Sequence, residues 1–82
     1  LQVVWLVPRK ITPKKTKNGK DYLVVDATDS NSSNIRIRCW GVDVRGGDNI
    51  QLNKPYLIRP QYNLEWGFST RGRAYRTWKA LA

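Results

Sequence analysis

Basic and aromatic side chains share one face of a short strand-like segment. Residues 35–40 alternate so that Arg36, Arg38 and Trp40 point to one side. Arginine binds phosphate through a planar fork of N–H donors, and tryptophan offers a π-surface on which any base can stack. The pattern predicts a contact surface for nucleic acid. The alternative is a solvent-exposed outer face on which Trp40 covers the edge of the core.

Lysines crowd the segment TPKKTKNGK at positions 12–20, which contains an Asn-Gly turn signal. A lysine ammonium makes a point-charge contact with phosphate, which suits a flexible nucleic-acid backbone. We expect a loop beside the arginine face, with its lysines on phosphates. A solubilising charge cluster is the alternative. The lysines concerned are Lys14, Lys15, Lys17 and Lys20.

A second group of aromatic residues comes shortly before a second group of arginines. Tyr62, Trp66 and Phe68 are followed by Arg71 and Arg73. Rings interleaved with arginines are typical of a groove that stacks bases and pairs with phosphates. The alternative is that one or two of the rings close the core. The binding residues predicted here are Trp66, Phe68, Arg71 and Arg73.

The remaining tryptophans and the single cysteine are expected to belong to the core. Trp5 and Trp78 lie in apolar strand-like runs. Cys39 alternates with the arginine face of residues 35–40, so its thiol should point inward and be packed and inert. One cysteine also excludes an internal disulfide framework, which is typical of a reducing cytoplasm in a bacterial or phage-infected cell.

Residues for catalysis or metal binding are scarce. The sequence has no histidine, no phosphate-binding glycine loop and no nucleophile motif. Asp26, Asp29, Asp43 and Asp48 fall in turns or spacers, where aspartate commonly caps the backbone, and no pair has a catalytic spacing. We expect a binding domain without enzymatic activity, metal, cofactor or small-molecule substrate.

Charge is the strongest compositional signal. Fifteen lysines and arginines against six acidic residues give a net charge of +9. Such a field attracts polyanions, so nucleic acid is the expected partner. No amphipathic helical period or apolar run of about 20 residues points to a membrane. The 82 residues make one domain, and a start at Leu1 indicates a fragment of a longer protein.

Hydrophobic alternation predicts an all-β domain of five strands near residues 2–11, 21–28, 35–40, 54–60 and 74–81. Residues 41–53 form the spacer between the third and fourth strands, as a short helix or a loop weakened by Gly46-Gly47. This order is that of an OB-fold, a five-stranded, partly open Greek-key barrel. An SH3-like barrel is the rival, but it lacks the long connection between strands three and four.

Positions 16–41, TKNGKDYLVVDATDSNSSNIRIRCWG, resemble OB domains. The segment is most similar to the OB domain of bacterial and phage replicative polymerases of the DNA polymerase III alpha-subunit type. The DSNSSN turn departs from the tight acidic-Gly turn usual in that family, and the second half agrees only in outline. The matching positions are Thr16, Gly19, Lys20, Leu23, Val25, Ala27, Asp29, Ile35 and Ile37.

The resemblance implies a nucleic-acid-binding accessory domain, with any catalysis elsewhere in the parent chain. We therefore expect a module that binds single-stranded DNA without sequence preference, near a replication active site. Two alternatives stay open: an RNA- or tRNA-binding OB domain, and an assembly domain that docks on another protein or on other domains of its parent.

Overall fold

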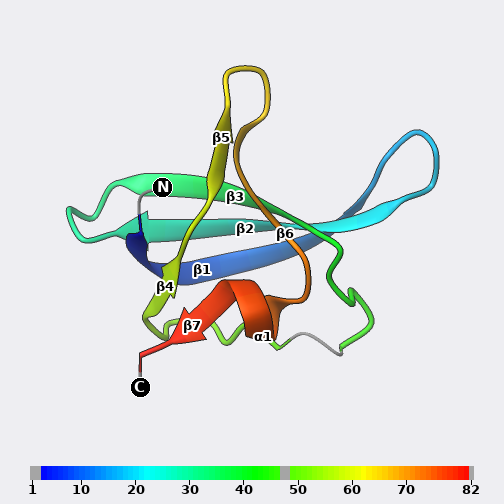
Figure 1. Ribbon diagram of the computed structural model, residues 1–82. Helices are drawn as coiled ribbons and strands as arrows, with labels where there is room; N and C mark the ends of the chain where they lie inside the picture. The colour runs from blue at the N-terminus through cyan, green and yellow to red at the C-terminus, as the bar shows by residue number, and fades with distance from the viewer. Residues whose placement is uncertain (1–2, 47–48, 82) are drawn as a thin grey trace.

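The computed structural model describes residues 3–46 and 49–81, which form a strongly curled β-sheet with one short helix (Figure 1). The expectation of an all-β domain is confirmed. Gln2, Gly47 and Asp48, which entered the sequence predictions, lie outside the described residues. The elements are β1 (Val4–Lys15), β2 (Asp21–Asp29), β3 (Asn34–Trp40), β4 (Tyr56–Ile58), β5 (Gln61–Asn63), β6 (Gly67–Arg71), α1 (Ala74–Thr77) and β7 (Trp78–Ala80).

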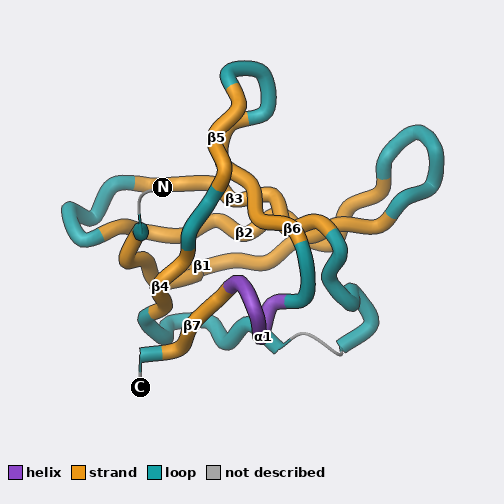
Figure 2. Tube along the Cα trace, viewed as in Figure 1, coloured by secondary structure: helices purple, strands orange, loops and turns teal. Residues whose placement is uncertain are grey.

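The sheet order is β5-β6-β3-β2-β1-β4-β7, so the long strands β1, β2 and β3 form its centre. These three make antiparallel neighbours, whereas β3 and β6 run parallel. In the views of Figures 1 and 2, β4 and β7 lie on one side of the central strands, and the β5–β6 hairpin projects on the other. The sheet curls into about half a barrel.

The first strand is longer than predicted, because residues 12–15 continue it instead of starting the loop. Lys15 still pairs with Asp21, and the turn is confined to positions 16–20. The Asn-Gly signal does produce the expected antiparallel hairpin, with Gly19 at φ 81°. Pro13 is accommodated within the strand, where it pairs with Leu23.

The chain after β3 departs most from the sequence prediction. No helix forms in the described parts of the spacer, 41–46 and 49–53; the one helical turn is α1, where the start of a fifth strand was expected. The predicted strand at 54–60 is reduced to β4, and β5 follows after Arg59 and Pro60. The described residues therefore hold seven strands rather than five.

The core lies inside the curl of the sheet. Ile37 and Cys39 are fully buried in it, so the predicted facing of β3 is confirmed. Trp78 is also buried, as expected, but Trp5 is 39% exposed and the prediction that it belongs to the core is wrong. Leu6, the neighbour of Trp5 on the alternating strand, takes the inward position instead.

A β-bulge at Arg9 explains why the facing of β1 was hard to derive. Pro8 pairs with Ala27 and Lys10 with Asp26, which leaves Arg9 as the extra residue. Before the bulge Leu6 faces the core; after it Ile11 does. Among the described residues, no helix has the length and apolar character needed to span a membrane.

Candidate nucleic-acid interface

The outer face of the sheet carries a row of polar and aromatic side chains set by strand register. Tyr22 pairs with Trp40, and Trp40 pairs with Arg71 of the parallel neighbour β6. In the next row, Arg38 lies opposite Ser69. Residues directly opposite each other in neighbouring strands share a face, so these side chains form one continuous floor.

The β1–β2 loop forms one wall beside this floor. Thr16 closes the loop, because its backbone N–H donates to the Lys20 carbonyl over 2.9 Å and its hydroxyl accepts from the Lys20 N–H over 3.0 Å. Lys17 and Asn18 lie between these ends and are exposed. The hydrogen bonds between Thr16 and Lys20 therefore hold both ends of the loop that carries Lys17.

The β5–β6 turn forms the opposite wall. The Asn63 side-chain oxygen accepts from the backbone N–H groups of Glu65 and Trp66, at 2.8 and 3.2 Å, which shapes the turn. The Arg38 guanidinium donates to the Trp66 carbonyl and so ties the turn to β3. Trp66 is consequently held at the groove while its side chain stays 55% exposed.

Floor and walls enclose a groove of about 920 Å³. None of the described residues that line it is acidic, and the described lining includes four basic and four aromatic side chains. Lys15 makes an ion pair with Asp21 at 3.7 Å, but both are well exposed, so the pair holds Lys15 only weakly. The basic and aromatic lining residues are Lys15, Lys17, Tyr22, Arg38, Trp40, Tyr62, Trp66 and Arg71.

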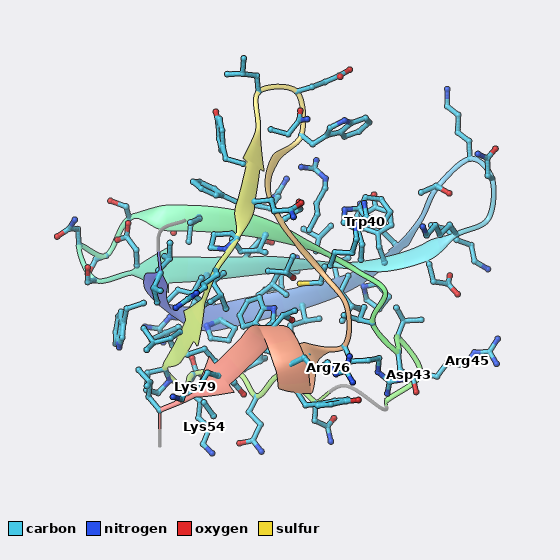
Figure 3. The ribbon with its side chains drawn as sticks, in the orientation of Figure 1. Trp40, Asp43, Arg45, Lys54, Arg76 and Lys79 are labelled. Carbon is cyan, nitrogen blue, oxygen red and sulfur yellow. The ribbon has the colours of Figure 1, made fainter. Side chains whose placement is uncertain are left out.

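The rings in the groove differ in how free their faces are. Trp40 is stacked on Tyr22, with centroids 4.3 Å apart and planes at 22°, and the Lys20 ammonium lies 5.8 Å from the Trp40 ring centroid. Trp66 and Tyr62 are exposed, at 55% and 62%. Trp40, which lies at the floor of the groove (Figure 3), is thus a partly covered ring, and Trp66 and Tyr62 are open ones.

Six of the residues predicted from the sequence meet at this groove, although three separate segments supply them. They are Lys15, Lys17, Arg38, Trp40, Trp66 and Arg71. Two further predicted lysines lie beside the groove. Lys14 is opposite Tyr22 in the strand register, and the Lys20 ammonium lies over the ring of Trp40, which lines the groove.

The other three predicted residues lie elsewhere. Arg36 makes an ion pair with Asp26 at 2.8 Å, in the row of the sheet beyond Arg38. Phe68 packs against the core, because its partner in register is the buried Ile37. Arg73 follows the end of β6 and lies 4.0 Å from Asp43.

Two groove aromatics were absent from the predicted binding residues. Tyr22 shares the face of Val24 and Asp26 on an alternating strand, a signal that was visible in the sequence. Tyr62 was noted with Trp66 and Phe68, but nothing local showed that it, and not Phe68, lies at the groove. Its ring contacts Phe68 with centroids 5.0 Å apart.

Most of the described carboxylates cap turns or pair with basic side chains. Asp29 accepts from the backbone N–H groups of Asn31 and Ser33, each at 2.9 Å, and Asp43 accepts from that of Arg45. Within the described ranges, no cluster of three or more Cys, Asp or Glu side chains is placed to hold a metal ion. Comparison with models of protein families, with curated proteins and with solved structures finds no match to this chain.

Proposed function

We propose that the groove between the β1–β2 loop and the β5–β6 turn binds single-stranded nucleic acid, DNA first, without base preference. The observation that carries the proposal is the joint lining of basic and aromatic side chains with no described acidic residue among them. Phosphates would meet Lys17, Arg38 and Arg71. Bases would stack on the open rings of Trp66 and Tyr62.

The preference for a single strand follows from the rings. In a duplex the base faces are stacked on one another, whereas an unpaired strand can turn its bases onto aromatic side chains. Stacking accepts every base because each has a π-face, which gives tight binding without sequence preference. Arg38 also donates to the Trp66 carbonyl, so this arginine would position the turn as well as neutralise phosphate.

Strand connectivity supports an OB-type Greek-key barrel as the finer description of the fold. β1 pairs with both β2 and β4, and β3 runs parallel to β6. β4 and β5 are separated only by Arg59 and Pro60, yet they stand near opposite ends of the sheet order. Counted as one bent strand, with β7 as an addition, they would give the five-stranded order of such a barrel. The groove then spans the face that OB-folds use for oligonucleotides.

An accessory role in a replicative polymerase is proposed on the resemblance of positions 16–41 to the OB domain of DNA polymerase III alpha subunits. That segment supplies six of the described lining residues of the groove, among which Thr16 is also one of the matching positions. They are Thr16, Lys17, Asn18, Tyr22, Arg38 and Trp40. Any catalysis would then belong to other domains of the parent chain.

The test is a fluorescence-anisotropy titration with labelled oligo-dT, oligo-rU and a DNA duplex of equal length. Trp66→Ala removes an exposed ring, so it should weaken oligo-dT binding by about 1–3 kcal/mol and leave the melting temperature nearly unchanged. Trp5→Ala is the matched control, because Trp5 is a second exposed tryptophan and is not among the described residues that line the groove.

The duplex is expected to bind more weakly than oligo-dT. Equal affinity for duplex and single strand, or unchanged oligo-dT binding by Trp66→Ala, would refute base stacking in this groove. Tighter binding of oligo-rU than of oligo-dT would identify RNA as the ligand.

A further inference from the structure

A second hollow lies far from the groove, where β4, β7 and the start of β1 meet α1. It has a volume of about 400 Å³ and includes Ile58 and Thr77 in its lining. Figure 3 shows Arg76 and Lys79 at the end of the molecule opposite the β5–β6 turn, well away from Trp40. The other described lining residues are Val3, Leu57, Arg59, Arg76 and Lys79.

The strand register explains the composition of this surface. Trp5 pairs with Leu57, and Leu57 pairs with Lys79, so one outer row runs from an exposed tryptophan through an aliphatic side chain to a lysine. Val3 extends the apolar part and is also exposed. The hollow therefore has an aliphatic floor and a basic rim.

The positive charge of the rim is not balanced within the described structure. Arg59, Arg76 and Lys79 are exposed, and none takes part in the ion pairs found among the described residues. After residue 49 the sequence has a single acidic residue, Glu65, which lies in the distant β5–β6 turn. A ligand for this surface must therefore bring the negative charge.

We propose that this hollow binds an acidic, partly apolar peptide segment of a partner protein. The carboxylates would pair with Arg59, Arg76 and Lys79, and an apolar side chain would cover Leu57 and Val3. Peptide is favoured over nucleic acid because the floor of the hollow is aliphatic, whereas four aromatic rings line the groove. The two exposed rings nearby, Trp5 beside Leu57 and Tyr75 beside Arg76, border the hollow and are not part of its described lining. The domain would then hold nucleic acid at one end and a protein at the other.

The probe is a fluorescein-labelled ten-residue peptide of alternating glutamate and leucine or valine, titrated by anisotropy at low salt. Two control peptides separate the contributions: one replaces glutamate by glutamine, and the other replaces the apolar residues by serine. We expect both controls to bind at least about tenfold more weakly, because charge and apolar contact each contribute.

Charge reversal locates the site. R59E/K79E should weaken peptide binding by about tenfold, since two attractive contacts become repulsive, and change oligo-dT binding less than about twofold. The matched control is K10E/R45E, which makes the same change in net charge at exposed residues that line neither surface. It should leave peptide binding within about twofold. Circular dichroism confirms that each variant is folded.

Trp66→Ala separates this proposal from the groove: it should weaken oligo-dT binding while peptide binding is unchanged. Peptide binding weaker than 1 mM, or equal loss in K10E/R45E and R59E/K79E, would overturn the proposal. A loss of oligo-dT binding in R59E/K79E as large as the loss of peptide binding would overturn it as well, and would assign the hollow to nucleic acid.

Discussion

The four tryptophans have four different environments, and these decide what each ring can do. Trp78 is 4% exposed and packs edge-on against Tyr56, with centroids 5.7 Å apart. Trp40 is stacked on Tyr22 at the floor of the groove, whereas Trp66 stands open at its wall. Trp5 lies on the outer face of β1, so its ring contributes more to the surface than to the core.

Stability measurements should separate the buried tryptophan from the exposed one. Trp78→Ala removes a buried ring and should lower the free energy of unfolding by about 3–5 kcal/mol, a large share of the total stability of a small domain. Trp5→Ala should cost clearly less, because part of its ring already contacts water. Urea denaturation followed by circular dichroism measures both, and an equal cost would contradict the exposed placement of Trp5.

At the scale of elements, the junction between β3 and β6 depends on a close backbone approach. Gly72 N–H donates to the Trp40 carbonyl over 2.8 Å, just beyond the last paired residues of the two strands. Gly41 adopts φ 75°, and a Cβ on it would lie 3.1 Å from the backbone nitrogen of Gly72. The contact therefore fixes the end of the groove floor that carries Trp40 and Arg71.

Alanine substitution at Gly19 and at Gly41 should separate the cost of backbone strain from the cost of a steric clash. Gly19→Ala introduces only backbone strain, since a Cβ at φ 81° meets nothing within 4 Å, and should cost about 1–2 kcal/mol. Gly41→Ala adds a clash with backbone that cannot rotate away, for roughly 1–3 kcal/mol more. Thermal or urea unfolding of both variants provides the comparison. A cost for Gly19→Ala equal to or above that of Gly41→Ala would show that the approach to Gly72 is not tight.

At the scale of the whole molecule, positive charge is spread over two separate surfaces. Four basic side chains are among the described residues lining the groove, and three are among those lining the hollow at the opposite end. All of the acidic side chains that are described lie outside both linings, in turns or in ion pairs along the sheet. Part of the net charge of +9 is therefore concentrated on two separate surfaces of the described structure.

The salt dependence of single-strand affinity should count the phosphate contacts made in the groove. If four to six phosphates are neutralised, the slope of log affinity against log salt should be roughly −3 to −4. Lys17→Ala with Arg71→Ala removes two contacts and should make the slope shallower by about 1.4. Lys10→Ala with Arg45→Ala is the control of equal charge and should leave the slope unchanged. A slope near zero, or the same change in both double variants, would exclude a phosphate-binding groove.

Local patterns in the sequence determined the parts of the structure that depend only on neighbours along the chain. The period of two placed Ile37 and Cys39 inside and Arg38 and Trp40 outside, because successive side chains of a strand point to opposite faces. The Asn-Gly signal predicted the first hairpin, in which Gly19 adopts a positive φ that few other residues accept. The excess of basic residues was equally plain, and together with the interleaved aromatic and arginine residues it suggested a polyanionic ligand.

Tertiary structure decided everything that depends on which strands become neighbours. The bulge at Arg9 reverses the facing of β1 and sends Trp5 outward, and the parallel pairing of β3 with β6 brings Arg71 beside Trp40. Phe68 and Tyr62 are direct partners in the β5–β6 register, yet Phe68 lies between Tyr62 and the buried Ile37 and packs on the core. Tyr62 lies on the edge strand β5 and stays 62% exposed. Periodicity gives each strand two faces, but only packing against distant segments selects which face is buried and which side chains share a groove.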